Sequence, residues 1–221
     1  MRFLFKVLVI LMPWGIKRLI LVRFFNYEIH SSAKIGLCWF YPKKLIMEAN
    51  SKVANFSVAV NLDLIHMQEY SSIGRSNWIT GYPSSSNVHF AHQSDRRAEL
   101  LIGRHSAITK NHHIDCTNSV VIGSFSTIAG YGSQLLTHSI DILESRQDSK
   151  PIVIGSYSFI GTDVVILGGS SLPDYSILGA KSLLNKKFLD SHKVYAGVPA
   201  TMRSSVDANA KYFNRLSGFI N

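Results

Sequence analysis

A six-residue spacing of aliphatic side chains is the feature that most restricts the fold of this chain. The longest unbroken run consists of Ile154, Ile160, Ile166, Leu172, Leu178 and Leu184. The residue four places after each of the first five is small or β-branched, and glycine often follows the aliphatic residue directly. An amphipathic helix repeats at three and four residues, and a half-buried strand repeats at two. A period of six therefore predicts short strands between tight bends, with one large apolar side chain buried on each side.

The same phase occurs earlier in the chain, in three shorter sets. They are Met67, Ile73 and Ile79; Ile102, Ile108 and Ile114; and Ile122 and Ile128. A hexapeptide period indicates a parallel β-helix, in which three hexads make one coil of about eighteen residues. The predicted stacking places Ile154 under Leu172, Ile160 under Leu178 and Ile166 under Leu184. The ends of such a stack need caps, and the alternative fold is a β-sandwich with coincidental spacing.

The most specific motifs lie between residues 122 and 200. They read IGSFSTIAG from Ile122, THS from Thr137, SKPIVIGSYSFIGTDVVILGG from Ser149 and YAGVPA from Tyr195. With the earlier YEIHSSAKIG and SSIGRSNWITG, they make residues 30–203 resemble the hexapeptide-repeat acyltransferases, and most of all the colanic-acid or exopolysaccharide-type acetyltransferases. The resemblance implies an all-β fold, a left-handed parallel β-helix, with short N- and C-terminal helical segments. It also implies a homotrimer in which two chains share each active site.

Three regions and two interruptions follow from this pattern. Residues 1–29 form a basic apolar N-terminal segment, residues 30–203 the β-helix domain, and residues 204–221 a C-terminal cap with a short helix, for example over 208–216. The hexads stop at two loops, 81–100 and 138–151. Long excursions from a compact coil are usually functional or mobile. In the resembling family, a loop at the second of these places covers the active site of the neighbouring subunit.

The resemblance assigns the catalytic base to His138, which precedes the loop returning to Lys150-Pro151. A neutral imidazole titrates near physiological pH and can take the proton of an acceptor hydroxyl or amine as it attacks a thioester. The adjacent His112 and His113 are rival candidates. An acceptor-side role is assigned to Asn111, His113 and Asp115, although each could be a polar residue at a bend. Cys116 is expected to be structural, because nothing else marks it as a nucleophile.

The resemblance also locates the donor, acetyl-CoA, along the small-residue bends of the last coils. Candidate cofactor-binding residues at these bends are Gly161, Thr162, Gly179 and Ala180. Small residues let a narrow ligand approach the backbone, although glycine also simply permits a bend. Basic residues that match the family's phosphate contacts are Lys186, Lys187 and Arg203. Lysine suits phosphate as a point charge, whereas a solvated lysine pair is the alternative. No metal is expected.

The chain is basic, with a formal net charge of +9, and part of this charge lies in the N-terminal segment. Residues 1–25 contain five Lys and Arg among bulky apolar residues, and no acid precedes Glu28. The uncharged run 7–12 is too short to span a bilayer, and no signal-peptide cleavage site follows. Such a segment suits the interface of an anionic membrane; packing against the domain or a partner subunit is the alternative. Nucleic acid is not expected as a partner, because no stacking platform accompanies the charge.

These observations predict an acyltransferase that moves an acetyl group from acetyl-CoA to a sugar hydroxyl or amine. The expected acceptor is a saccharide of envelope polysaccharide or glycolipid synthesis, free or lipid-linked. Two isolated cysteines favour a cytoplasmic protein, here one that can lie peripherally on the inner face of the cytoplasmic membrane. Alternatives on the same fold are an inactive β-helix scaffold or membrane-docking protein, and a metal enzyme of the γ-carbonic-anhydrase kind, whose histidine spacing this chain lacks.

Overall fold

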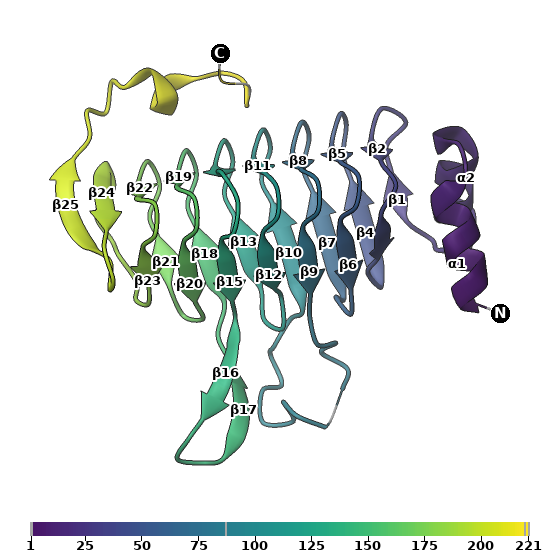
Figure 1. Ribbon diagram of the computed structural model, residues 1–221, viewed down its shortest axis with the longest axis horizontal. Coiled ribbons are helices and arrows are strands. Elements are labelled where there is room, and N and C mark those ends of the chain that lie inside the picture. Colours follow the sequence, from purple (N-terminus) through teal and green to yellow (C-terminus); the bar gives the residue numbers. More distant parts are fainter. Residues whose placement is uncertain (1, 87, 219, 221) are drawn as a thin grey trace.

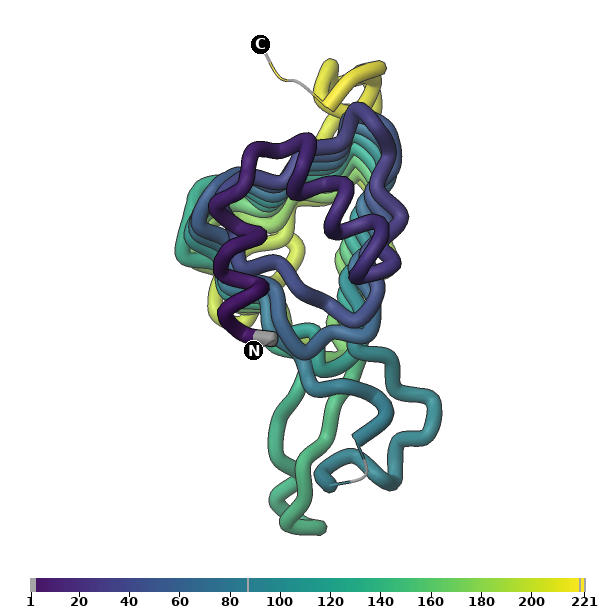
Figure 2. The backbone as a smooth tube through the Cα atoms, turned by 90° about the vertical axis from the view of Figure 1, so that its right-hand side faces the viewer, coloured from purple at the N-terminus to yellow at the C-terminus, as the bar shows by residue number. Residues whose placement is uncertain are grey.

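The computed structural model describes residues 2–86, 88–218 and 220 of the chain. Residues 1, 87, 219 and 221, which belong to the expected N-terminal segment, first loop and C-terminal segment, lie outside the described residues. The chain forms a solenoid whose strands stack side by side along one axis, with two helices at the N-terminal end (Figure 1). Viewed along that axis, each coil is roughly triangular (Figure 2). The predicted parallel β-helix is confirmed.

Three parallel sheets form the walls of the solenoid. The first sheet contains β1 (Glu28–Ile29), β4 (Lys44–Met47), β7 (Leu64–Met67), β10 (Glu99–Ile102), β13 (Val120–Ile122), β18 (Ile152–Ile154) and β21 (Ser171–Leu172). The second contains β2 (Lys34–Ile35), β5 (Lys52–Val53), β8 (Ser72–Ile73), β11 (Ala107–Ile108), β14 (Thr127–Ile128), β19 (Phe159–Ile160), β22 (Ile177–Leu178) and β24 (Lys193–Ala196). The third contains β3 (Trp39–Tyr41), β6 (Val58–Val60), β9 (Trp78–Thr80), β12 (His113–Asp115), β15 (Gln134–Leu136), β20 (Val165–Leu167) and β23 (Leu183–Leu184).

The aliphatic residues of the six-residue pattern point into the solenoid and stack in register. Ile154 pairs with Leu172, Ile160 with Leu178 and Ile166 with Leu184, as predicted. All six side chains are fully buried. Where the phase breaks at the exposed Gln134, Leu135 takes the core position between Ile114 and Ile166. The apolar core therefore runs the length of the solenoid as stacked rows, one row per sheet.

The small residues of the pattern close the bends between sheets. Ser126, Ser158 and Ser170 are buried, and each donates its hydroxyl to a carbonyl of the following coil. Their hydroxyls thus satisfy backbone groups that the strand ladders leave free. Gly161 lies so close to the next coil that an added Cβ would come 2.6 Å from the amide nitrogen of Ala180. We name the bends in chain order: the first corner joins first and second sheets, the second corner joins second and third, and the third corner returns to the first sheet.

Aromatic side chains stack along the first corner, a feature that the six-residue pattern does not predict. The rings of Tyr70, His105, Phe125, Tyr157, Tyr175 and His192 form one ladder, with neighbouring centroids 4.6–5.2 Å apart. Each of these residues has a positive φ between 53° and 58°. A left-handed conformation is unfavourable for non-glycine residues, and the stacking contacts offset that cost.

The C-terminal segment differs from the expected helical cap. Strand β25 (Thr201–Ser205) turns back antiparallel to β24 and extends the second sheet. The expected helix over 208–216 is only a 3₁₀ turn, η1 (Lys211–Asn214). The segment then runs along the first corner, where Phe213 packs edge-on against Tyr175 and the amide of Gly218 donates to His105 Nδ1 at 3.1 Å. It is a strap along the side of the solenoid, held by the aromatic ladder.

Two helices cover the opposite end of the solenoid, α1 (Arg2–Leu11) and α2 (Trp14–Phe24). Pro13 separates them, because proline has no amide hydrogen to donate within a helix. Val9 and Leu21 are buried and join the core of the first coil. The N-terminal segment thus packs on the domain, which was one of the two expectations for it. In the described part of the chain, neither helix has the length and apolar composition needed to cross a bilayer.

Both predicted interruptions leave the solenoid at its third corner and project in the same direction (Figures 1 and 2). The first is the loop between β9 and β10. The second is a hairpin of two antiparallel strands, β16 (His138–Asp141) and β17 (Arg146–Ser149). Gln93 of the loop donates to Asp148 Oδ1 at 2.7 Å and accepts from Ser149 Oγ at 2.6 Å. The two projections therefore form one structural unit beside the third corner.

Candidate active site

His138 and Asp115 meet at the third corner, at the base of the hairpin. Asp115 ends β12 and is paired in register with Leu136 of β15, two residues before His138. His138 Nδ1 lies 2.9 Å from Asp115 Oδ2. The two residues are 23 positions apart in sequence, but the stacking of the fourth and fifth coils brings them together.

Asp115 is held from several sides. Its Oδ1 accepts from the amide and the hydroxyl of Thr117, at 3.1 and 2.6 Å. Its Oδ2 also accepts from the hydroxyl of Thr137 at 2.6 Å and from the amide of His138 at 3.1 Å. Burial alone would raise the pKa of Asp115, but the hydrogen bonds from His138, Thr117 and Thr137 hold that pKa well below its ordinary value. The buried group is therefore a carboxylate.

The same contact sets the protonation of His138. The hydrogen bond to Asp115 raises the pKa of His138 above its ordinary value, against a smaller opposite effect of burial. With Nδ1 donating to the carboxylate, Nε2 carries the lone pair of the neutral ring. The His138 side chain is 46% exposed and that of Asp115 only 6%. An orienting carboxylate beneath an accessible imidazole is the arrangement that general-base chemistry needs.

Asp115 therefore does not offer the acceptor contact that was expected of it, because its carboxylate oxygens are buried and already accept hydrogen bonds. His113 is exposed on the outer face of β12, two residues before Asp115, between Trp78 and Gln134 of the adjacent coils. Asn111 is an exposed residue of the second corner with φ of 55°. These two positions can be reached by an acceptor, but only His113 lies on the sheet that leads to His138.

The rival base His112 is buried and fully engaged. Its Nε2 lies 2.9 Å from Thr109 Oγ1, and its Nδ1 accepts from the amide of Ser133. Burial lowers the pKa of His112 to about 4. Cys116 is fully buried, and burial raises the pKa of its thiol well above the ordinary value. Neither side chain is available to a substrate.

A small hollow extends from His138 toward the C-terminal end of the solenoid. Its volume is about 200 Å³, and its lining includes His138, Lys150, Gly168 and Asn185. Gly168 is required there, because a Cβ would come 2.5 Å from the carbonyl oxygen of Thr137. Asn185 directly precedes Lys186 and Lys187, which are exposed at the same corner two coils further on. These two lysines therefore share the corner of His138, about 10 Å along the axis.

The remaining donor-side candidates lie at a different edge of the third sheet. Gly161, Thr162, Gly179 and Ala180 follow β19 and β22 at the second corner. Arg203 joins them, since its Nε donates to Ala196, whose side chain faces Gly179. From Thr162 to Gly168 the chain crosses the whole third sheet, about 20 Å at 3.3 Å per residue. Within one chain, the candidate base and the candidate donor corner are thus one sheet width apart.

Arg96 fastens the loop 81–98 to the site, although nothing in the sequence pattern singles it out from the adjacent Arg97. Arg96 is buried and donates to the carbonyls of Tyr82, Pro83 and Thr117. Its guanidinium also lies 4.5 Å from the Phe90 ring. Because Thr117 itself binds Asp115, Arg96 connects the loop to the carboxylate beneath His138.

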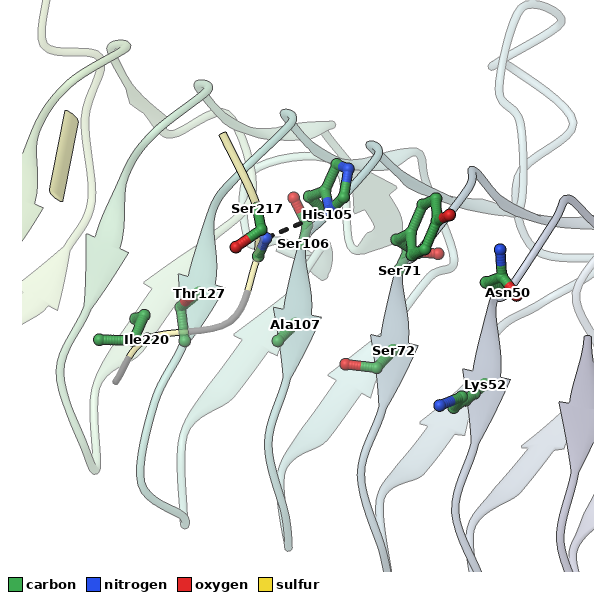
Figure 3. Close-up of a pocket in the computed structure, with 12 residues that line it drawn as sticks. Asn50, Lys52, Ser71, Ser72, His105, Ser106, Ala107, Thr127, Ser217 and Ile220 are labelled. Atoms are coloured by element: carbon green, nitrogen blue, oxygen red, sulfur yellow. Dashed lines mark hydrogen bonds between the residues drawn. The ribbon is translucent and has the colours of Figure 1, made fainter. Parts of the chain in front are cut away.

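Another hollow lies far from His138, along the first corner (Figure 3). It has a volume of about 660 Å³ between the strap and the second sheet, and Tyr70, His105, Lys52 and Ile220 are among its lining residues. His105 is already bonded to Gly218 there. The described residues contain no cluster of three or more His, Cys, Asp or Glu that could bind a metal ion.

The fold and the site together define a hexapeptide-type β-helix with a carboxylate-held histidine beside a projecting hairpin. No family model matches the chain. Over 148 residues it is 27% identical to the galactoside O-acetyltransferase of Escherichia coli (strain K12), covering 65% of this chain and 68% of that protein. The chain is thus similar to the hexapeptide-repeat acetyltransferases of the left-handed β-helix type, and the predicted enzyme class, an acyltransferase, is confirmed.

Two solved structures share the fold. The polysialic acid O-acetyltransferase OatWY superposes with a TM-score of 0.59 at 14% identity, over 81% of this chain and 84% of that one. The hexapeptide-repeat acetyltransferase VCA0836 of Vibrio cholerae O1 biovar eltor, complexed with acetyl coenzyme A, has a TM-score of 0.51 at 23% identity, over 63% and 69% of the two chains. At this level of identity, the two likenesses establish the β-helix fold.

Proposed function

We propose that this protein transfers an acetyl group from acetyl-CoA to a saccharide hydroxyl, with His138 as the general base. The observation that carries the proposal is the half-exposed imidazole whose Nδ1 is held 2.9 Å from a buried carboxylate. His138 Nε2 takes the hydroxyl proton while the oxygen attacks the thioester carbonyl. The C–S bond then breaks, the new C–O bond remains, and the imidazolium returns the proton to the departing thiolate. An amine acceptor would follow the same course.

Acetyl-CoA is the donor on chemical and comparative grounds. The second corner offers Gly161 and Gly179, whose missing side chains leave the backbone approachable, and the third corner offers Lys186 and Lys187 as cations for phosphate. Both lysines are exposed, although Lys186 also lies 5.2 Å from the Phe188 ring. A structure of the same fold is a complex with acetyl coenzyme A. These residues are the proposed donor contacts of this chain.

The acceptor is proposed to be a saccharide, because two similar proteins are named for saccharide acceptors. Their names specify a galactoside and polysialic acid. In this chain, the acceptor would reach His138 past the exposed His113 and the hairpin. A saccharide of envelope polysaccharide or glycolipid synthesis fits this assignment.

Each active site is proposed to form between two chains of a homotrimer. In a single chain the base lies at the third corner and most of the donor residues at the second, one sheet width apart. Placing the third corner of one chain against the second corner of another would bring the two sets together. A cyclic trimer does so three times with one kind of contact.

The proposal is tested by following thiol release from acetyl-CoA with a panel of sugars and nucleotide-sugars. Replacing His138 with Ala should lower kcat about 10²- to 10⁴-fold, the usual contribution of a general base, while acetyl-CoA binding is retained. An inactive scaffold would release no thiol with any acceptor. Full activity of His138→Ala would exclude His138 as the base.

A further inference from the structure

The N-terminal helices have an outer face, pointing away from the solenoid, that is mainly apolar. It consists of Leu4, Leu8 and Leu11 of α1 and Ile16 and Leu19 of α2, each more than half exposed. Residues 4, 8 and 11 recur at four and three positions and so share one side of α1. The opposite sides of the helices carry Val9 and Leu21 into the core. A terminal cap of a solenoid normally presents polar residues to water, so this outer face requires a partner.

Most cations of this region lie behind the outer face; the exception is Arg23, which is exposed four residues after Leu19 on the same side of α2. The Lys17 ammonium donates to the carbonyl of Gly36 in the first coil, and Arg18 donates to the carbonyl of Ile29 at 2.7 Å. Lys6 lies 4.7 Å from the centre of the Tyr41 ring. Three of the five basic residues in the N-terminal segment therefore fasten the helices to the solenoid. Further exposed cations, Lys34 and Lys43, lie on the first coil and just after it.

The charge at this end is strongly one-sided. Residues 1–47 contain eight Lys and Arg against a single acidic residue, Glu28, which pairs with Lys44 at 3.0 Å. An apolar face with a surrounding layer of cations matches an anionic lipid bilayer, where apolar side chains enter the acyl boundary and cations remain among the headgroups. A second copy docked on the same face would instead bring two layers of cations together with only Glu28, already paired with Lys44, as an acidic residue on each side, which is repulsive.

We infer that the helical layer docks the protein on an anionic membrane surface, with the solenoid axis standing away from the bilayer. The helices α1 and α2 lie across the end of the solenoid, not along a wall (Figures 1 and 2). His138 belongs to the fifth coil, four rises of about 4.8 Å above the first. Adding a helical layer about 10 Å thick places the imidazole roughly 30 Å from the lipid.

The distance between His138 and the lipid limits which acceptors can reach the base, a consequence that rests on the proposed function. A saccharide linked to a lipid in the same membrane can present to His138 only those sugars that extend about 30 Å from the bilayer. The docking itself does not depend on catalysis and is tested separately.

Flotation with vesicles tests the docking directly. The full chain should float with phosphatidylcholine vesicles that contain phosphatidylglycerol, and far less with phosphatidylcholine alone or at high salt. The double variant Leu8→Glu/Leu19→Glu removes two apolar contacts and should bind about a hundredfold more weakly, since each buried leucine is worth at least a factor of ten. The matched control is Leu189→Glu/Leu216→Glu, which changes two highly exposed leucines elsewhere and should float normally.

Two results would overturn the inference. One is equal flotation of the two double variants. The other is a wild-type chain that ignores vesicles but doubles its assembly size in solution in a Leu8- and Leu19-dependent manner, which would assign the face to a second copy. Thiol release with a water-soluble acceptor should be unchanged in Leu8→Glu/Leu19→Glu, so a failure of docking remains distinguishable from a failure of the catalytic proposal.

The orientation is tested with fluorophores attached at Ala54→Cys and Ala180→Cys. Both residues are exposed at the second corner, but in the second and seventh coils, about 24 Å apart along the axis. If the protein docks by the end of its solenoid, the fluorophore at position 54 should transfer energy strongly to acceptor dyes in the lipid. The fluorophore at position 180 should transfer energy only weakly. Equal transfer from both positions would mean that a wall of the solenoid lies on the membrane.

Discussion

One carboxylate organises the candidate active site at the scale of single residues. Asp115 accepts six hydrogen bonds, from Thr117, Thr137 and His138. The two threonines attracted no attention in the sequence, where hydroxyl residues are common at every bend. Their role arises because a buried carboxylate is costly unless each oxygen is satisfied. The signal that sequence reasoning could have used is the adjacent pair Thr137-His138 following Asp115 by about one coil.

Replacing Asp115 with Asn tests this network through the pH dependence of the reaction. His138 must be neutral to act as a base, so kcat/KM falls as the pH drops below its pKa. Asp115 raises that pKa, and its loss should move the acidic limb of the profile to lower pH. The rate at the plateau should fall, because the ring loses its orienting partner. A profile of kcat/KM against pH measures both effects.

The matched control is Asp207→Asn, the same change at an exposed position of the strap. It should change neither the plateau value of kcat/KM nor the pH at which kcat/KM falls on the acidic side. An Asp115→Asn enzyme whose acidic limb coincides with that of the wild type would show that the pair does not set the protonation of the base.

At the scale of elements, the hexads and the interruptions were not equally predictable. A strand of two or three residues is specified by one inward aliphatic residue and a bend, so its position can be found from local sequence. The hairpin β16–β17 carries no such pattern: β16 is mostly exposed, whereas β17 is mostly half-buried or buried. It is held by Gln93 of the other projection, 56 residues away. Its strand pairing therefore could not be predicted from residues 138–151 alone.

Arg96 should control the order of the loop 81–98. The variant Arg96→Met keeps the apolar stem but leaves the carbonyls of Tyr82, Pro83 and Thr117 without their donor. Each unpaired buried group costs about 1–3 kcal/mol, so we expect the loop to open, with faster proteolysis between residues 81 and 98. Because Thr117 binds Asp115, kcat should fall as well. Limited proteolysis and steady-state kinetics measure the two effects.

The neighbouring Arg97→Met is the control, because Arg97 is exposed. It should retain the proteolysis rate and the kcat of the wild type. If the two variants were cleaved equally fast, Arg96 would not be what fastens the loop.

At the scale of the whole molecule, the candidate residues fall into two groups that one chain keeps apart. The base, its carboxylate and Lys186 and Lys187 lie at the third corner, whereas Gly161, Thr162, Gly179, Ala180 and Arg203 lie at the second. All of these residues were assigned to the same site from the sequence, Asp115 as an acceptor contact and the others from the resemblance. The assignment can hold for all of them only if two chains contribute to each site.

Mixing two inactive chains tests this arrangement. Ala180→Glu adds bulk and negative charge at an exposed position of the second corner, and it should block the donor without disturbing the core. Trimers assembled from equal amounts of His138→Ala and Ala180→Glu chains should regain about a quarter of the wild-type activity, because each site draws on two chains at random. Thiol release before and after co-refolding measures the recovery.

The control is Ala54→Glu, the same change at the second corner of the second coil. Trimers made only of this variant should be active. Two inactive chains that restore no activity when they are assembled together would show that each site is built within one chain.

The β-helix, its inward residues and the places where loops leave it could be predicted from the sequence, because each hexad carries its own strand and bend in a local period. The candidate base came from the resemblance to the hexapeptide-repeat acyltransferases. The tertiary structure alone decided which side chains meet. Asp115 and His138 are separated by 23 residues, and they come together because β12 and β15 pair in register, Asp115 with Leu136, which leaves His138 two residues further on at the same corner. It also decided that the apolar residues of the N-terminal helices divide between the core and a bare outer face, because helix burial depends on where the first coil lies.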